Sequence, residues 1–288
     1  MTATLIQILI LGLVQGAAEL LPVSSSAHVI VAEKLIGLDP SSPEMTFLLV
    51  MLHTGTMFAV IAYFWNSWRK NFFGSAEKFR ATAVNVVIAT VVTGVVGLAL
   101  QYLIEKVFLR QDGTKAEVEM LFGQLPLIAA ALALAGGLII VSGIRDDRRR
   151  AQGSLSPVKS AWIGAVQGLC LPFRGFSRSG ATISTGLLAG IARRKCEEFS
   201  FALAVVLTPP IIAKEFLRLL KSRSGSAPHF QVAQMILPGV FGMFCSFVAG
   251  LLALWLLSRW LEQGRWKFFG FYCLAFALVV LALSQIGF

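Results

Sequence analysis

Charge is scarce in this sequence, and that scarcity argues against a soluble globular protein. Only 14% of the 288 residues are Asp, Glu, Lys or Arg, whereas soluble domains carry roughly 25%. Hydrophobic residues make up 56%, and the mean hydropathy is +0.76. No stretch between the apolar runs is longer than a loop, so no soluble domain is expected. We predict one integral membrane domain covering residues 1–288.

Acidic side chains are fewer than basic ones, and the net charge is therefore +10. Binding to nucleic acid is one explanation of such an excess. The Lys and Arg residues, however, lie in short loops between apolar runs, where basic residues set the topology of a membrane protein. We therefore expect membrane lipids as partners and no nucleic acid.

Cysteine is also sparse, and it points to no metal site or disulfide framework. Four cysteines are spread along the chain without metal-like spacing, so we expect free thiols: Cys170, Cys196, Cys245 and Cys273. P-loop, dinucleotide-binding and zinc motifs are missing. Residues 1–18 carry no charged side chain, so the basic start of a cleavable signal peptide is missing too. We expect the N-terminal segment to be retained.

Apolar runs are what the sequence has in abundance. Six of them reach or approach the roughly 20 residues of a spanning helix: 46–65, 81–104, 120–144, 199–213, 230–258 and 268–288. The shortest, 199–213, is flanked by charged side chains that can extend to the membrane surface. Its Thr208-Pro209-Pro210 sequence predicts a kink.

Four other apolar pieces are short or borderline for a span, and they flank two polar breaks: 1–18, 20–32, 160–173 and 179–192. Lengths of 13 or 14 residues suit re-entrant or buried helices better than spans. Each half therefore reads as a broken helical hairpin followed by three spans. We predict an all-α membrane fold with six transmembrane helices and two re-entrant hairpins.

The two halves of the chain resemble each other. The lead-in Leu11-Gly12-Leu13-Val14-Gln15-Gly16 is repeated as Ile163-Gly164-Ala165-Val166-Gln167-Gly168. A highly charged stretch, 145–154, separates a first repeat of about 1–146 from a second of about 155–288. Because three spans per half is an odd number, the second half must run inverted relative to the first. Inverted-topology repeats typically place a shared site near the midplane.

The basic residues also predict which side of the membrane each loop faces. Loops 66–80, 145–159, 193–195 and 259–267 together contain 15 Lys and Arg, and those on the other side contain 8. The positive-inside rule places the richer side in the cytoplasm. Both termini then face outward.

The strongest sign of function is Glu19, a carboxylate inside an apolar segment, because intramembrane charges are costly and usually functional. Gln15 precedes it by one helical turn on the same face. The pair can hold a metal ion, a water or a proton. The alternative is a hydrogen-bonded pair that only joins two helices.

Hydroxyl clusters follow both breaks and predict an anion site. Ser24, Ser25 and Ser26 can cap a helix that begins near Ala27. In the second half Ser177 and Ser179 can cap a helix that begins near Gly180. In an inverted repeat these two helix N-termini converge, and free N–H groups there favour anions.

Arginine and histidine add chemistry to this anion site. Arg178 carries a planar fork suited to phosphate oxygens, and Arg174 either adds a second or reaches the membrane surface. His28 follows Ser25 by three residues on one helix face, so it can serve as a general base or acid beside that hydroxyl. The alternative is a structural buried histidine. His53 also lies inside a span, where it can support the site.

The motifs together resemble those of the bacterial undecaprenyl-diphosphatase family of the bacitracin-resistance type. They are Gln-x-x-x-Glu at 15–19, Leu-Pro-Val-Ser-Ser-Ser-x-His at 21–28 and Gly-Phe-Ser-Arg-Ser-Gly-Ala-Thr at 175–182. The resemblance covers essentially the whole chain. It implies a phosphatase of the bacterial cytoplasmic membrane with its site open to the periplasm. Such an enzyme removes the terminal phosphate of undecaprenyl diphosphate and so recycles a polyprenyl carrier lipid for peptidoglycan synthesis.

The resemblance also implies roles for single residues. Gln15 and Glu19 match the pair that would hold a divalent cation, Mg²⁺ or Ca²⁺. The implied catalytic set is Glu19, Ser25, His28 and Arg178, and the implied phosphate-binding set is Ser24, Ser26, Ser177, Ser179, Thr182 and Arg174. This chain departs from the family pattern Pro-Gly-x-Ser-Arg-Ser, because its 172–177 segment places the proline earlier and adds Arg174.

Three alternatives remain open at this point. Either His28 deprotonates Ser25 for attack on the terminal phosphorus, or it activates water directly. A secondary transporter or flippase for a lipid phosphate would use the same inverted repeat and arginine, although it has no chemical need for a Ser-His pair. The oligomeric state is also open, with a homodimer as one alternative.

Overall fold

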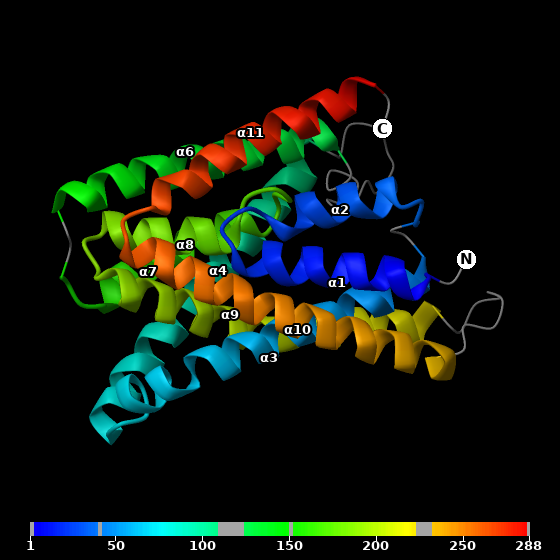
Figure 1. Ribbon diagram of the computed structural model, residues 1–288. Coiled ribbons are helices and arrows are strands. Elements are labelled where there is room, and N and C mark those ends of the chain that lie inside the picture. The colour runs from blue at the N-terminus through cyan, green and yellow to red at the C-terminus, as the bar shows by residue number, and fades with distance from the viewer. Residues whose placement is uncertain (1–2, 40–41, 109–123, 150–151, 223–231, 287–288) are drawn as a thin grey trace.

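In the computed structural model, residues 3–39, 42–108, 124–149, 152–222 and 232–286 are described, and they are almost entirely helical (Figure 1). The described segments contain ten helices and, apart from one isolated bridge between Gly153 and Ile191, no β-structure. The prediction of an all-α fold is confirmed. The four cysteines are free, as expected.

Six helices are long and apolar enough to cross a membrane, and each covers one of the predicted spans: α3 (Pro43–Asn71), α4 (Ala76–Phe108), α6 (Leu125–Arg149), α9 (Arg193–Ser222), α10 (Val232–Glu262) and α11 (Trp266–Gln285). The predicted ends at 120–123, 230–231 and 287–288 lie outside the described residues. Helix α9 continues through Pro209 and Pro210, and its kink stays a prediction. The protein is a multi-pass membrane protein.

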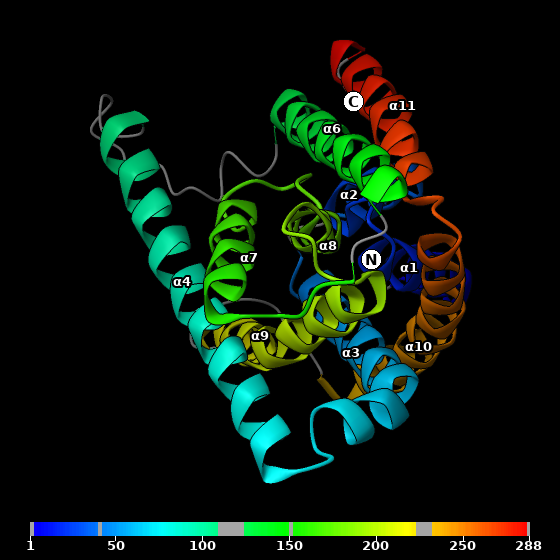
Figure 2. The same ribbon diagram turned by 90° about the vertical axis from the view of Figure 1, so that its left-hand side faces the viewer.

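The four shorter helices form two hairpins: α1 (Leu5–Leu20) with α2 (Ser25–Leu35), and α7 (Pro157–Cys170) with α8 (Arg178–Leu188). Helix α1 begins at the same end of the molecule where α11 ends, and the turn to α2 lies near the middle of the molecule (Figure 1). Helix α8 is surrounded by α6, α7 and α9 (Figure 2). The re-entrant course of both hairpins within a bilayer stays a prediction.

The first helix of each half packs against the fourth helix of the other half. Helix α1 lies along α10, and α7 lies along α4. Glycines make both contacts close: a Cβ at Gly16 would lie 2.6 Å from the Ser246 carbonyl oxygen, and one at Gly164 would overlap the Ala89 carbonyl oxygen. Small residues spaced four apart allow such approach of membrane helices. The division into repeats itself stays a prediction.

Helix α6 ends, and α9 and α11 begin, at the end of the molecule opposite the first residue of α1 (Figure 1). Charged side chains join the three helices there. Arg193 of α9 bonds Asp146 at 2.5 Å and Asp147 at 3.1 Å, both on α6. Lys267 of α11 bonds the same Asp147 at 3.1 Å. Nearby, Glu198 of α9 pairs with Arg194 at 3.1 Å. The ion pairs of Arg193 and Lys267 hold α6, α9 and α11 together at this end, whereas the Arg194–Glu198 pair lies within α9.

The glycine contacts predict a difference in stability between two substitutions. Gly164→Val should lower the free energy of unfolding by about 1–3 kcal/mol, because the added carbons overlap the α4 backbone. Gly137→Ala in α6 should change it little, since nothing beyond the adjacent backbone of its own helix lies within 4 Å of the added Cβ. Thermal unfolding of the purified protein in detergent measures both. Equal melting temperatures for the two variants would contradict the close α4–α7 contact.

Candidate functional site

The site is built around Glu19, which lies in the last turn of α1. The helix ends there because Pro22 cannot continue it and forces an extended conformation on Leu21 (φ −71°, ψ 152°). The chain then turns and α2 begins at Ser25. The turn brings the first residue of α2 back beside the last turn of α1.

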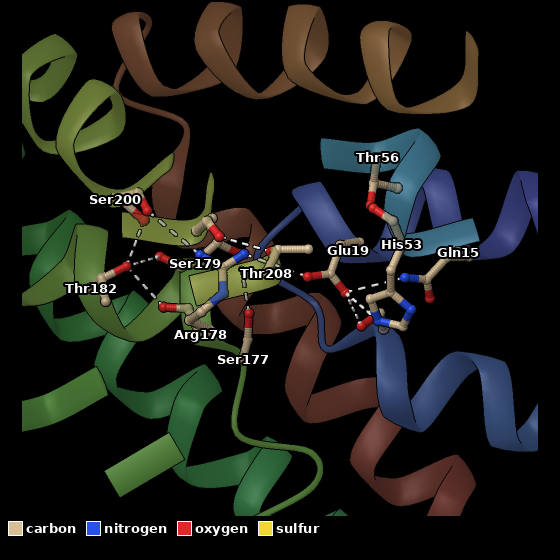
Figure 3. Close-up of polar contacts among 12 residues, drawn as sticks. Gln15, Glu19, His53, Thr56, Ser177, Arg178, Ser179, Thr182, Ser200 and Thr208 are labelled. Atoms are coloured by element: carbon tan, nitrogen blue, oxygen red, sulfur yellow. Dashed lines mark hydrogen bonds and ion pairs between the residues drawn. The ribbon is translucent and has the colours of Figure 1, made fainter. Parts of the chain in front are cut away.

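Glu19 accepts hydrogen bonds from its own helix and from two other helices, α2 and α8 (Figure 3). Its Oε2 accepts hydrogen bonds from Ser25 Oγ at 2.6 Å and from Gln15 Nε2 at 3.3 Å. Its Oε1 accepts one from Arg178 Nη2 of α8 at 3.4 Å. A guanidinium beside a carboxylate favours the ionised form. The carboxylate and guanidinium remain about one-fifth exposed, at 20% and 22%.

Helix α8 presents Arg178 at its first position. Ser177 is the N-cap, and its Oγ accepts a hydrogen bond from the Gly180 N–H at 3.2 Å, as predicted. The N-termini of α2 and α8 converge, because Ser25 and Arg178 both contact Glu19. The two polar breaks therefore lie together, as the sequence predicted.

Three predicted phosphate-binding hydroxyls already have partners within the protein. Ser177 serves as the cap, and Ser179 Oγ donates to the Leu21 carbonyl at 3.3 Å, which joins α8 to the α1–α2 turn. Thr182 Oγ1 donates to the Arg178 carbonyl at 2.9 Å and lies 2.6 Å from Ser200 Oγ of α9. All three are buried. In this conformation their hydroxyls support the site, and their role in phosphate binding stays a prediction.

The serines before α2 do not cap it as predicted. The helix begins at Ser25, and the side chain of Ser24 makes no capping hydrogen bond. Ser24 instead has a φ of +69°, a conformation that costs a non-glycine residue about 1–3 kcal/mol and is typical of functional sites. This backbone leaves Ser25 free to bond Glu19. Ser26 is half-buried in the first turn of α2.

His28 does not pair with Ser25 as expected. Its Nδ1 donates to the Ser24 carbonyl at 2.8 Å, and its Nε2 lies 2.7 Å from the Tyr272 hydroxyl of α11. The ring is also stacked on Phe276, with centroids 3.9 Å apart. Both ring nitrogens are therefore occupied, and the hydroxyl of Ser25 is directed to Glu19.

His53 is the imidazole that faces Glu19. Its Nε2 lies 3.8 Å from Glu19 Oε2, and its Nδ1 donates to the Leu49 carbonyl one turn earlier in α3, at 2.8 Å. Figure 3 shows Gln15 and His53 on one side of Glu19 and Arg178 on the other. The histidine that was expected to support the site thus lies directly in it.

Arg174 lies on the loop before α8 with an exposed side chain. Its charge acts on the carboxyl of Glu33 in α2, a buried residue whose Oε1 has no hydrogen-bond partner. The arginine that bonds Glu19 is Arg178. Arg174 thus interacts electrostatically with Glu33.

The side chains around Glu19 suit a divalent cation that is also coordinated by groups from outside the protein, such as phosphates and waters. Among the described residues, no three His, Cys, Asp or Glu side chains cluster as a metal site. The site offers one carboxylate, the Gln15 amide and the Ser25 hydroxyl. Mg²⁺ commonly binds through one or two carboxylates together with substrate phosphates and waters. The residues therefore fit a cation that arrives with a phosphate ligand.

Sequence reasoning missed two residues of the site. Ser200 joins Thr182 and accepts from Arg178 Nη1 through its carbonyl at 3.5 Å. Tyr272 holds His28. Both lie in apolar runs, where single Ser and Tyr residues are common, so only their neighbours in space distinguish them. His53 was noticed because histidine inside a span is rare.

Comparison with known proteins gives a consistent result. The family model described as bacitracin resistance protein BacA matches residues 8–279. Undecaprenyl-diphosphatase 2 of Acinetobacter baylyi is 59% identical over 283 residues, which cover 97% of this chain and 98% of that protein. Undecaprenyl-diphosphatases of Desulfosudis oleivorans and Bacteroides fragilis are 34% and 30% identical, over 97% and 96% of this chain and 98% and 97% of those proteins.

The unusual backbone of Ser24 generates a prediction about stability. Ser24→Gly should raise the free energy of unfolding by about 1 kcal/mol, because glycine adopts a positive φ without strain. Ser24→Val should lower it, since a β-branched side chain tolerates that conformation least. Chemical or thermal unfolding in detergent measures the order. If Ser24→Gly is less stable than wild type, the Ser24 side chain must stabilise the fold by more than its positive φ destabilises it.

Proposed function

This chain belongs to the bacitracin resistance protein BacA family, and from that membership we propose that it hydrolyses undecaprenyl diphosphate to undecaprenyl phosphate and inorganic phosphate. It is an undecaprenyl-diphosphatase, and the product is the carrier lipid of peptidoglycan synthesis. The relatives carry the name of a hydrolase, so the transporter alternative is set aside.

One observation carries the chemistry: a single carboxylate joins a hydroxyl and a guanidinium from the two halves of the chain. Glu19 accepts from Ser25 Oγ at 2.6 Å and from Arg178 at 3.4 Å. Ser25 is a candidate nucleophile, and arginine binds phosphate oxygens through a planar fork. A phosphate held by Arg178 would therefore lie beside the hydroxyl that attacks it.

The proposed reaction follows from these positions. Ser25 Oγ attacks the terminal phosphorus, and its proton passes to Glu19, the group to which it already donates. The anhydride P–O bond breaks and undecaprenyl phosphate leaves. Arg178 and the free N–H groups at the start of α2 offset the negative charge. Water then attacks the phosphoserine phosphorus, and the P–Oγ bond breaks. Ser25 Oγ takes back the proton held by Glu19, and the water's oxygen and both its protons leave in the inorganic phosphate.

His28 takes a different place in this scheme from the one the sequence suggested. With Nδ1 bound to Ser24 and Nε2 to Tyr272, it holds the Ser24 carbonyl and thus the turn that orients Ser25. Proton abstraction is assigned to Glu19 because of its 2.6 Å hydrogen bond with Ser25. Activation of water by His28 would require it to leave Tyr272.

A divalent cation, Mg²⁺ or Ca²⁺, is part of the proposal. Gln15 and Glu19 would hold it together with the substrate's phosphates. When bound, it would supply charge neutralisation on the diphosphate. Gln15 is buried, and its Nε2 donates to Glu19 at 3.3 Å, so the amide lies beside the carboxylate and would offer its Oε1 to the cation.

The membrane setting completes the proposal. The substrate is a polyprenyl diphosphate lipid, and the protein resides in the bacterial cytoplasmic membrane with its site and termini toward the periplasm. The basic end formed by α6, α9 and α11, with Arg193 and Lys267, supports a cytoplasmic position for that end.

The two arginines of the second motif should behave differently. Arg178→Ala should lower kcat for phosphate release from undecaprenyl diphosphate about a hundredfold or more, because it removes the guanidinium group beside Glu19. Arg174→Ala is the matched control and should lower it a few-fold at most. The assay uses purified protein in detergent with Mg²⁺, with EDTA as a further control. Equal losses in two folded variants would refute the assignment of Arg178 as the phosphate clamp.

Covalent catalysis by Ser25 is tested separately. Rapid acid quenching with a substrate labelled in its terminal phosphate should trap the label on wild-type protein, and Ser25→Ala should carry none and release almost no phosphate. Glu19→Gln should slow formation of the labelled species, since the amide cannot take the proton. Rapid turnover by Ser25→Ala would exclude this route in favour of attack by water.

A further inference from the structure

The imidazole of His53 faces the site with its lone pair. Its Nδ1–H donates to the Leu49 carbonyl at 2.8 Å, so in the neutral ring the other nitrogen, Nε2, carries no hydrogen. Nε2 and Glu19 Oε2 lie 3.8 Å apart, which is too far for a hydrogen bond. In the neutral ring, the lone pair of Nε2 and the Glu19 oxygen thus face each other without a hydrogen bond between them, and one cation could bind both.

A metal ion satisfies this arrangement. Two donor atoms 3.8 Å apart are both within reach of one ion at bond lengths of about 2.1 Å. Metal-binding histidines almost always donate their other N–H to a carboxylate, carbonyl or water, which fixes the ring. The bond from Nδ1 to Leu49 is an interaction of this kind. The imidazole is 39% exposed, so Nε2 is accessible to a ligand.

The remaining groups agree with a mixed nitrogen and oxygen site. Gln15 and Ser25 bond the same Glu19 oxygen that faces His53, while Arg178 occupies the other oxygen. The cation and the guanidinium would therefore use opposite sides of one carboxylate. The site has a single carboxylate, so the imidazole supplies a donor that an all-oxygen Ca²⁺ site would not contain.

We infer that His53 is a ligand of the divalent cation, with Nε2 and Glu19 Oε2 sharing one ion. This assignment rests on the proposed function, because the substrate's diphosphate would complete the coordination. Imidazole nitrogen favours transition-metal ions over Ca²⁺. The chain should therefore bind Mn²⁺ more tightly than Ca²⁺, and His53 should be the reason.

The experiment measures the ligands of Mn²⁺ directly. The full-length protein in detergent is loaded with Mn²⁺ and a non-hydrolysable prenyl methylenediphosphonate, and pulsed electron paramagnetic resonance records the nuclei coupled to the ion. Labelling with ¹⁵N-histidine identifies an imidazole signal, because the chain contains only three histidines. His53→Gln is the test variant, and His28→Gln and His229→Gln are the matched controls. Mn²⁺ and Ca²⁺ affinities are measured on the same samples.

The expected result is a ¹⁵N-histidine coupling in wild type that both controls keep and only His53→Gln loses. Mn²⁺ affinity should fall about tenfold in that variant, with a smaller change for Ca²⁺. Phosphorus coupling without nitrogen coupling in wild type would overturn the inference, as would a nitrogen signal that survives in His53→Gln. Failure of the wild-type protein to bind Mn²⁺ in the presence of the diphosphonate would overturn the inference as well. Phosphate release by wild-type protein is assayed alongside, and its absence would instead refute the proposed function.

Discussion

The ion pair between Glu19 and Arg178 is the interaction on which the site depends. A carboxylate within an apolar hairpin is costly unless a partner compensates its charge. Here the partner comes from the other half of the chain, at 3.4 Å. Each polar break therefore compensates a charge of the other. The need to compensate one charge thus brings a hydroxyl, an amide, an imidazole and a guanidinium to one place.

Much of the fold could be predicted from the sequence because the membrane imposes strong rules. Six apolar runs became six long helices, and Pro22 marks the turn between α1 and α2. The exact ends were less predictable. Helix α9 begins at Arg193 and α10 continues to Glu262, so both extend into charged residues that the apolar runs excluded. Hydropathy detects the part of a helix in contact with lipid, whereas the helix continues as long as its backbone bonds are satisfied.

Several members of the site could be predicted from the sequence, but Ser200, Tyr272 and the pairings of the side chains could not. Glu19, Ser25 and Arg178 were found because charges and clustered hydroxyls are unusual in apolar sequence. The choice between His28 and His53 could not be made in the same way. Spacing places His28 on the same helix as Ser25, yet the positive φ of Ser24 and the hydroxyl of Tyr272 direct the ring elsewhere. A backbone conformation of one residue and a contact across more than two hundred residues of chain lie beyond sequence patterns.

The pairing of α1 with α10 and of α7 with α4 has a consequence for how the protein is made. Helix α1 is synthesised first, but its main packing partner is the second-last helix of the chain. Helix α7 differs, because α4 is already in place when it emerges. Until α10 is inserted, the glycine face of α1 is therefore covered only by lipid or by the insertion machinery. Chains truncated before α10 lack the surface that seats Gly12 and Gly16, and they should be substrates for membrane quality-control proteases.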